Sequence, residues 1–362
     1  MGRRGLRLNP HVNPEENLAK VDSTSITNVV DVALRCHPVD FPPPWLCQLR
    51  AEPLRMPPTG HTPHFFIQQS PSNANHLTSN MKIALIGAAG QLGSDLRACL
   101  TDDVTGLTHD QIEITEPASV DAALSSLRPD VVINAAAYNQ VDRAEDEPDA
   151  AYAVNAIGPR NLARYCSAHD ATLVHVSTDY VFGADATRNT PYAETDAPGP
   201  LGKYAISKLA GEEFVRGACP RHFVIRTCGL YSRRSTSGNF VKTMLRLAVE
   251  RDELRIVDDQ HCTPTASEDL AGAIKKLIGT QSYGLFHATS SGATTWHDFA
   301  REIFRLAGIS INVVPITSAE YPTPARRPTY SVLDTKKLSG TLGCQLPAWQ
   351  NALARFMAER RD

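Results

Sequence analysis

The chain has 362 residues, of which 42% are hydrophobic and 21% are charged, and its formal net charge at pH 7 is −3. These fractions are typical of a globular protein, and the length suffices for two domains. Because the net charge is slightly negative and no Lys/Arg-rich run occurs, we expect neither nucleic acid nor a membrane surface as a partner.

Residues 1–80 differ in character from the rest of the chain. They contain eleven prolines, including Pro42-Pro43-Pro44, and no sustained apolar period of 2 or 3.6 residues. Such a segment buries little apolar surface, so we expect it to be mostly disordered, with at most an amphipathic turn around residues 26–34. The pattern changes abruptly at Met81. Met81 as the true start of the protein and a functional N-terminal extension both remain open.

From Met81 onward, short apolar runs alternate with segments of helical periodicity, which indicates β-α-β units and a parallel sheet. We therefore predict an α/β protein with a Rossmann-type doubly wound parallel sheet in residues 81–260, to which 227–250 adds part of a substrate lobe. Residues 261–362, proline-rich after Tyr283, should form mainly that smaller C-terminal substrate-binding lobe and the C-terminal helices. Strands are expected at 83–86, 104–107, 131–133, 173–176, 223–226 and 254–257, and helices at 91–100, 120–127, 149–168, 204–217 and 240–250.

The first predicted strand leads directly into Gly87-Ala-Ala-Gly90-Gln-Leu-Gly93 and then into a helix. In a dinucleotide site the first glycine allows the tight turn, the second lets the backbone approach a pyrophosphate, and the third lets the helix pack on the strand. The N–H groups at the start of the helix then face the anion. Because a strand precedes and a helix follows, the pattern predicts a dinucleotide site, with a plain tight turn as the alternative.

The end of the second predicted strand bears on the type of cofactor. NAD sites often place a carboxylate there, about 20 residues after the glycines, to bind the ribose 2′-hydroxyl. Thr108 stands at this point and would not repel a 2′-phosphate, which favours NADPH, while the nearby Asp110 leaves NADH possible. Glu113 and Ile114 are candidates for contact with the adenine, although Glu113 could equally be an ordinary solvated carboxylate.

Tyr204 and Lys208 are four residues apart at the start of a predicted helix, so their side chains share one face. Reducing a ketone requires a hydride on carbon and a proton on oxygen, and a lysine cation nearby should lower the pKa of the phenol toward neutrality. Thr178 ends the fourth predicted strand, where its hydroxyl could stabilise a developing oxyanion. The small residues in Asn134-Ala-Ala-Ala137 leave room for a flat cofactor. A Tyr-x-x-x-Lys pair alone is more often a surface pair, but this combination predicts a reductase.

These motifs resemble those of the dTDP-4-dehydrorhamnose reductase family of extended short-chain dehydrogenases. The resemblance covers about residues 81–360 and implies reduction of the 4-keto group of dTDP-4-dehydro-6-deoxy-L-mannose, which gives dTDP-L-rhamnose. The stretches that carry it are 134–148, 153–156, 177–182, 200–212, 239–248, 259–260, 264–265, 294–298 and 321–328.

The resemblance also implies roles for individual residues. Tyr204 would donate the proton, with Lys208 as its partner, and both would contact the cofactor. Further cofactor contacts would come from the glycine-rich turn and from two later strand ends. The implied residues are Gly90, Gln91 and Leu92 at the pyrophosphate; Glu113, Ile114, Ala137, Tyr138 and Asn139 along the cofactor; and Val141, Thr178 and Asp179 facing the substrate.

The chain departs from this family's pattern in two places. Gly229 stands where the family commonly has a tryptophan near the active site, which puts the exact sugar in doubt. Some members bind magnesium with three acidic residues, and the corresponding positions here are Asp95, Glu268 and Lys336. Because a cation among the ligands opposes metal binding, we expect no magnesium and claim no metal-bridged dimer.

None of the eight cysteines forms a Cys-x-x-Cys pair, so zinc and a redox dithiol are not expected either.

Two other functions remain open. One is a sugar-nucleotide epimerase or dehydratase of the same superfamily, against which Thr108 argues weakly. The other is a non-catalytic NADP-binding regulatory subunit, which would not need Tyr204 and Lys208. We expect a cytoplasmic protein with free thiols, because no apolar run is long enough to span a membrane and no secretory signal is recognisable. A monomer and a homodimer both remain open.

Overall fold

Residues 80–234 and 238–358 are described by the computed structural model of the chain. The expectations for residues 1–79, including the turn near residues 26–34, lie outside the described residues.

A six-stranded sheet with all strands parallel forms the centre of the nucleotide-binding part, in the order β10-β5-β4-β3-β1-β2. From β1 the chain moves to one side to form β2, and then to the other side to form β3. The carboxyl ends of β1 and β3 therefore lie at the point where strand order reverses, which is where open α/β sheets bind ligands. The strands are β1 (Lys82–Ile86), β2 (Asp103–Leu107), β3 (Val131–Asn134), β4 (Thr172–Thr178), β5 (His222–Thr227) and β10 (Gly284–His287).

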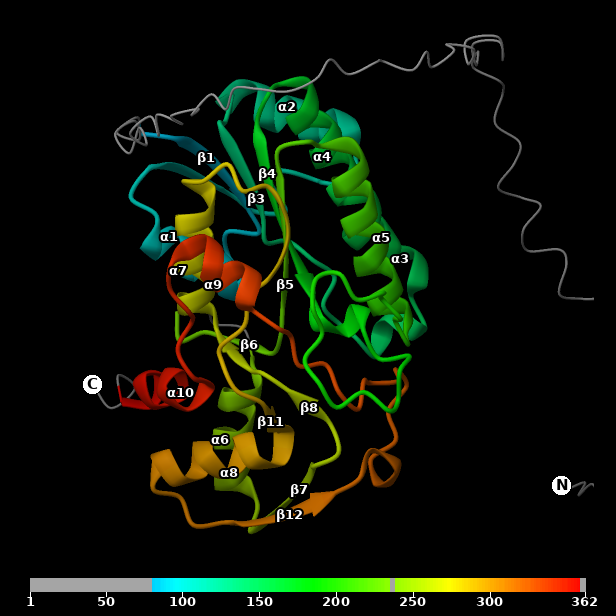
Figure 1. Cartoon of the computed structure of the whole chain (residues 1–362), viewed down its shortest axis with the longest axis vertical. Coiled ribbons are helices and arrows are strands. Elements are labelled where there is room, and N and C mark those ends of the chain that lie inside the picture. The colour runs from blue at the N-terminus through cyan, green and yellow to red at the C-terminus, as the bar shows by residue number, and fades with distance from the viewer. Residues whose placement is uncertain (1–79, 235–237, 359–362) are drawn as a thin grey trace, which may run out of the picture. The chain divides into compact units, whose positions relative to one another are not determined.

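Helices cover both faces of this sheet (Figure 1). On one face α1 (Gln91–Cys99) packs against α7 (Ser267–Ile278), and Leu92, Leu96 and Ile274 join them in one apolar core. The short helix α9 (Lys336–Leu342) packs beside β10 on the same side. The opposite face carries α2 (Pro117–Leu127), α4 (Gly158–Ala168) and α5 (Lys203–Ala218) over a second apolar core.

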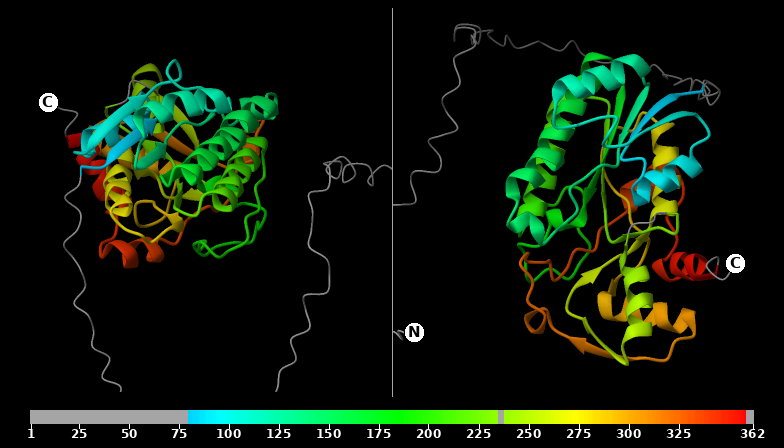
Figure 2. Two further views of the ribbon diagram at one scale, coloured as in Figure 1. Left: turned by 90° about the horizontal axis from the view of Figure 1, so that it is seen from above. Right: turned by 180° about the vertical axis from the view of Figure 1, so that it is seen from behind.

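A smaller lobe follows beyond the sheet and is seen from two sides in Figures 1 and 2. Its two-stranded parallel sheet pairs β7 (Glu253–Val257) with β12 (Asn312–Ile316). Phe299, which is fully buried, lies at the centre of its own apolar core. The helices around this core are α6 (Phe240–Glu250), α8 (Trp296–Ala307) and α10 (Trp349–Ala358).

The first five predicted strands of the main sheet are confirmed. The sixth is also a strand, but its assignment to the main sheet is wrong. Residues 254–257 form β7 in the small lobe, and β10, from the region expected to belong mainly to that lobe, completes the main sheet. The burial pattern gives the reason. β7 alternates exposed and buried residues, as expected for a strand with one solvated face, whereas β3 is buried at every residue.

The helix predicted at 149–168 is present but interrupted. It consists of α3 (Pro148–Tyr152), a π-helical turn at Ala153–Ile157 and α4. Among the described residues, no helix combines the length and the apolar character that a membrane crossing requires.

Candidate active site

The glycine-rich turn joins β1 to α1 and leaves a cradle that only glycine fits. Gly87 has a φ of +77°, and a Cβ at this position would lie 2.7 Å from the backbone nitrogen of Ala136. A Cβ on Gly93 would overlap the carbonyl oxygen of Gly87. Gly90 is the N-cap of α1 and supplies no capping side chain, so amides of the first helical turn are left for an anionic ligand. The shape and donors of this turn fit a dinucleotide pyrophosphate.

A cavity of about 450 Å³ opens between this turn and the carboxyl ends of the central strands. Its lining comes from the glycine-rich turn, the small residues after β3, the end of β4 and the first turns of α5. The predicted catalytic residues and most of the predicted cofactor contacts therefore line one space. Its lining residues are Gly90, Gln91, Leu92, Ala135, Ala136, Ala137, Asn139, Val176, Ser177, Thr178, Tyr204, Lys208, Thr227, Gly229, Leu230 and Gly238.

Tyr204 lies in the first turn of α5 and is only 8% exposed. Its hydroxyl donates to Oδ1 of Asn139 at a distance of 3.5 Å. Burial raises the pKa of this phenol well above its usual value, and a hydrogen bond with Thr178 only partly opposes that shift. The phenol is consequently neutral at physiological pH and holds the proton that a reductase must deliver.

Lys208 lies one turn further along α5, where its ammonium donates to the carbonyl oxygen of Val176 at 2.6 Å. Burial lowers the pKa of Lys208 to about 8, and the nearby carboxylate of Glu212 counteracts part of this effect. The expectation that Tyr204 has a lowered pKa is wrong for this structure. Desolvation dominates at Tyr204, and the lysine is directed to a backbone carbonyl of β4.

Thr178 and Asp179, at the end of β4, are both buried. The hydroxyl of Thr178 donates to Asp179 Oδ1 at 3.2 Å, and Ser331 donates to the other carboxylate oxygen at 2.5 Å. Burial nevertheless raises the pKa of Asp179 from 3.8 to about 6, because these hydrogen bonds do not fully replace water. The carboxyl group therefore changes its charge close to neutral pH.

We expect the effect of Asp179→Asn on stability to depend on pH. Because the folded-state pKa of about 6 lies above the value of 3.8, ionisation of Asp179 opposes folding. This unfavourable contribution is absent below about pH 4 and complete above about pH 6. Relative to the parent, the variant should gain roughly 1–3 kcal/mol in its free energy of unfolding as the pH rises across that window. Urea denaturation at several pH values measures this difference, and a pH-independent difference would contradict it.

The residues predicted to hold the adenosine half of the cofactor lie at the edge of the sheet. Thr108 directly follows β2, and its hydroxyl donates to Oε1 of Gln111 at 3.1 Å. The carboxylate of Glu113 accepts hydrogen bonds from the backbone N–H and the hydroxyl of Thr115, which lower the pKa of Glu113. The side chain of Ile114 is buried in the core. The side chains of Glu113 and Ile114 are thus both engaged within the protein, although that of Glu113 is still 36% exposed.

Tyr138 and Asn139 follow β3 on a loop. Asn155, to which the sequence analysis gave no role, holds this loop in place. The side chain of Asn155 accepts from the N–H of Tyr138 at 2.9 Å and donates to its carbonyl at 3.0 Å and to the Ser207 hydroxyl at 3.0 Å. Asn155 reaches these groups from the π-helical turn. A buried Asn inside an otherwise apolar helical pattern is the signal that could have identified it, since π-turns often accompany functional sites.

Gln91, expected at the pyrophosphate, also connects the glycine-rich turn to the small lobe. Its side-chain oxygen accepts from the N–H of Ser232 at 3.1 Å and from Nδ2 of Asn239 at 3.0 Å. Asn239 is in turn the N-cap of α6.

Two further hollows continue from the catalytic residues toward the small lobe. Val141 and Tyr204 line a narrow one, together with Tyr180 and Arg326. A cavity of about 940 Å³ lies between the small lobe and the loop at 318–327, and Tyr180 and Arg326 line it as well. Trp296, at the start of α8, forms part of its wall. A long ligand could therefore have one end at Tyr204 and the other in the large cavity.

Gly229 has a φ of +50°, and a Cβ there would lie 3.1 Å from the indole of Trp296. Trp296, the first residue of α8, thus places an indole ring next to Gly229. This contact explains why a glycine is needed: the backbone is left-handed and the space is already filled.

The three positions at which the sequence analysis considered magnesium have side-chain partners within the protein. Arg234 lies 3.4 Å from the carboxylate of Asp95, and Arg233 lies 3.4 Å from that of Glu268. Lys336 pairs with Asp334 at 3.0 Å.

Beneath the site, Arg226 of β5 and Glu212 of α5 form an ion pair that is almost completely buried. The guanidinium donates to both carboxylate oxygens, at 2.9 and 2.6 Å, and the Ser177 hydroxyl donates to the same carboxylate at 2.5 Å. This network joins the end of β4 to the helix that carries Tyr204 and Lys208.

Comparison with known proteins agrees with this geometry. A family model described as RmlD substrate binding domain matches residues 81–361. A dTDP-4-dehydrorhamnose reductase of Sinorhizobium fredii is 39% identical over 290 residues, which cover 76% of this chain and 97% of that protein. A probable dTDP-4,6-dihydroxy-2-methyloxan-3-one 4-ketoreductase of Streptomyces antibioticus is 41% identical over 280 residues, covering 75% and 93%. The solved structure of a dTDP-4-dehydrorhamnose reductase from Bacillus anthracis in complex with NADP is 39% identical, covering 78% of this chain and all of that chain with a TM-score of 0.75.

Proposed function

Because the chain belongs to the family described as RmlD substrate binding domain, we propose that it reduces the 4-keto group of a dTDP-4-dehydro-6-deoxy sugar with NADPH. The substrate best supported is dTDP-4-dehydrorhamnose, which would give dTDP-L-rhamnose. The observation that carries this proposal is the shared cavity in which a neutral, buried phenol at Tyr204 stands with Lys208 and Thr178 beside the glycine-rich turn.

In the proposed reaction, NADPH supplies the hydride that reaches the keto carbon. Tyr204 delivers its proton to the keto oxygen, which becomes the hydroxyl of the product. Thr178 donates a hydrogen bond that stabilises the negative charge developing on this oxygen. Lys208 would hold the nicotinamide ribose, and its positive charge would stabilise the phenolate that is left when Tyr204 has given up its proton.

The cofactor-binding residues that we propose follow the sequence analysis. Gly87, Gly90 and Gly93 form the cradle, and Gln91 and Leu92 open the helix against the pyrophosphate. The nicotinamide half would lie against Ala137 and the loop after β3, and the adenosine half against the end of β2. The remaining proposed contacts are Thr108, Glu113, Ile114, Tyr138, Asn139, Tyr204 and Lys208.

On the substrate side, we assign the sugar to Val141, which lines the narrow hollow beside Tyr204, and to Thr178 and Gly229, which line the catalytic cavity, with Asp179 next to Thr178. The nucleotide would then occupy the cavity of about 940 Å³, whose size suits a nucleotide. Since Arg326 lines both this cavity and the hollow that contains Tyr204, its guanidinium is placed to pair with the diphosphate between sugar and base.

Arg326→Ala should accordingly raise KM for the nucleotide sugar about tenfold or more and leave kcat within a factor of about three. The reason is that a charge-assisted hydrogen bond to the diphosphate acts equally on the ground state and the transition state. Steady-state kinetics with saturating NADPH measures both constants. As a matched control, Arg301→Ala removes an exposed arginine that pairs only with Asp298 among the described residues. A similar rise of KM in the control, or none in Arg326→Ala, would contradict the assignment.

Cofactor preference gives a second test. Thr108→Asp places a carboxylate at the end of β2, where it would repel a 2′-phosphate and accept a hydrogen bond from a ribose hydroxyl. We expect the parent to bind NADPH at least as well as NADH, and the variant to shift the ratio of the two dissociation constants about tenfold or more toward NADH. Fluorescence titration with both cofactors measures the ratio. An unchanged preference would show that Thr108 does not face the ribose.

The activity itself is tested by following NADPH consumption against a panel of 4-keto nucleotide sugars. Turnover of dTDP-4-dehydrorhamnose to dTDP-L-rhamnose supports the proposal, and the panel identifies the preferred sugar. Isomerisation without net NADPH consumption would favour an epimerase, and NADPH binding without any turnover would favour a non-catalytic subunit.

We further propose that the enzyme acts in the cytoplasm, since the six cysteines within the described residues are free thiols, as is usual in a reducing compartment. Its assembly as a monomer or homodimer and its division near residue 260 into two domains remain predictions. Light scattering and limited proteolysis test them.

A further inference from the structure

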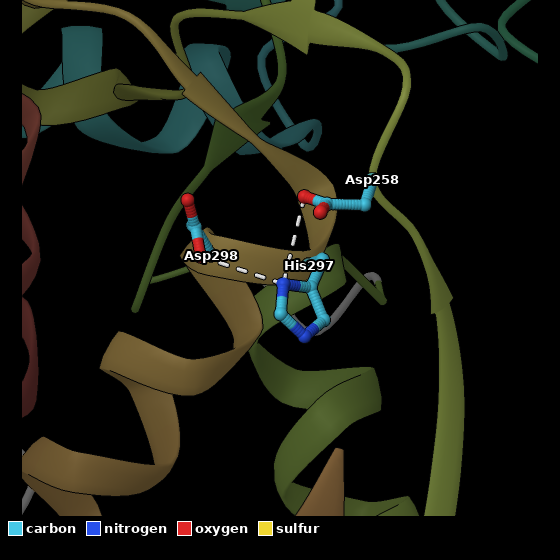
Figure 3. A group of neighbouring side chains, drawn as sticks. All are labelled: Asp258, His297 and Asp298. Atoms are coloured by element: carbon cyan, nitrogen blue, oxygen red, sulfur yellow. Dashed lines mark ion pairs between the residues drawn. The ribbon is translucent and has the colours of Figure 1, made fainter. Parts of the chain in front are cut away.

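Three side chains outside the catalytic cavity converge where β7 meets α8. Asp258 is the first residue after β7, and His297 and Asp298 belong to the first turn of α8. One side-chain nitrogen or oxygen from each of them lies within 4.8 Å of the others. Figure 3 shows the two carboxylates on different sides of the same imidazole nitrogen.

His297 is the buried member of this cluster and is only 6% exposed. Its Nε2 lies 3.4 Å from the carbonyl oxygen of Val313, which can accept a proton from it. Its Nδ1 has no hydrogen-bond partner, although it is buried. If Nε2 carries the proton of the neutral ring, Nδ1 directs a lone pair into the space between the two carboxylates.

The distances in this space suit a cation better than a proton. Nδ1 lies 3.5 Å from Oδ1 of Asp258 and 3.4 Å from Oδ1 of Asp298. These separations are too long for good N–H···O hydrogen bonds, which are about 2.7–3.2 Å. Two ligands on one tetrahedral zinc ion, with bonds of about 2.0–2.2 Å, are separated by about 3.4 Å. Both separations match that value.

We propose that Asp258, His297 and Asp298 bind one divalent transition-metal ion of the zinc type. An imidazole together with carboxylates suits such ions, whereas magnesium and calcium prefer oxygen ligands alone. The carboxylate side chains are 42% and 57% exposed, so water can complete the coordination from the open side. This proposal departs from the sequence analysis, which expected no metal because it considered only cysteine pairs and the magnesium positions.

A neighbouring hydroxyl already orients one of the proposed ligands. Thr295 donates to Oδ1 of Asp258 at 2.6 Å and accepts from the backbone N–H of Asp298 at 3.1 Å as the N-cap of α8. Partners of this kind fix the orientation of metal ligands. Val257 and Trp296, which directly precede Asp258 and His297, line the cavity of about 940 Å³. The proposed ion would thus join the two elements that form this wall.

The test uses the full-length protein, stripped with a chelator and titrated with Zn²⁺ alone. Bound zinc is measured by equilibrium dialysis, and Co²⁺ substitution reports the geometry through its visible absorption. The parent should bind one more zinc ion per chain than His297→Phe, show the absorption of four-coordinate cobalt, and melt at a higher temperature with zinc than without. Comparing parent with variant subtracts any zinc held by other histidines and cysteines.

Two further variants complete the test. Asp298→Asn changes a side chain that is 57% exposed, so the variant should fold even if His297→Phe does not. It should weaken zinc binding at least about tenfold. His109→Phe is the matched control, because it removes an exposed imidazole 3.5 Å from Glu113 and should leave zinc binding unchanged. Equal zinc content and equal affinity in the parent and Asp298→Asn would overturn the proposal, as would the absence of zinc binding by the parent.

Discussion

Tyr204→Phe should lower kcat by about 10²- to 10⁴-fold, the usual contribution of a positioned proton donor. The substitution keeps the ring, which is buried at the start of α5, and removes only the hydroxyl that lies 3.5 Å from Asn139. Because the proposed cofactor contacts are made mainly by the glycine-rich turn, the dissociation constant for NADPH should change little. Stopped-flow or steady-state measurement of NADPH oxidation, with a separate binding titration, gives both values.

A matched control is available in Tyr192, whose buried hydroxyl has no hydrogen-bond partner and lies outside the catalytic cavity. Tyr192→Phe should leave kcat unchanged.

Lys208→Met should reduce both the rate and cofactor affinity, because Lys208 is assigned two roles. Thr178→Val should mainly slow turnover, by at most about 2.7–4 kcal/mol in the activation free energy. Parent-like turnover by Tyr204→Phe would exclude this mechanism.

Glu212→Gln is expected to have the largest effect on stability, lowering the free energy of unfolding by about 3–5 kcal/mol. The substitution leaves the Arg226 guanidinium in the interior without its anionic partner, while both side chains are at most 1% exposed. It also weakens the hydrogen bond from Ser177. Chemical denaturation followed by circular dichroism measures the loss.

The exposed pair Arg246 and Glu250 provides the comparison, since its N···O distance is 2.9 Å but its side chains are 61% and 50% exposed. Glu250→Gln should cost less than about 1 kcal/mol, because solvent screens surface ion pairs. Replacing Glu212 and Arg226 together by leucine should recover much of the loss. A cost at Glu212 as small as that at Glu250 would mean that the buried pair contributes no more than a surface pair.

Much of the site could be predicted because its signals are local. The order of strand, glycine-rich turn and helix specified the cradle at Gly87 and Gly93, and a helical spacing of four placed Tyr204 and Lys208 on one face. Parallel strands then bring their carboxyl ends to one edge, which is why Thr178 joins them in the same cavity. These steps require only periodicity and topology.

The rest depends on burial and on contacts between distant segments. Spacing placed Lys208 near Tyr204, but only the three-dimensional structure shows that desolvation dominates the pKa of the phenol. The sixth strand was misassigned because an apolar run of four or five residues does not reveal which sheet it joins. His297 and Asp258 are 39 positions apart in the sequence, so their meeting depends on how β7 and α8 pack.

The hydrogen bonds of Gln91 have a consequence for the order in which ligands bind. One amide oxygen joins the turn that cradles the pyrophosphate to the cap of α6, and Phe240, Met244 and Leu247 of α6 line the cavity proposed for the nucleotide. A cofactor bound at this turn would therefore be connected to one wall of the second site. If binding of one ligand increases the affinity for the other, thermodynamic reciprocity requires that the second ligand increases the affinity for the first by the same factor. We therefore expect bound reductant to favour capture of the sugar, and the sugar to bind more weakly when the reductant is absent.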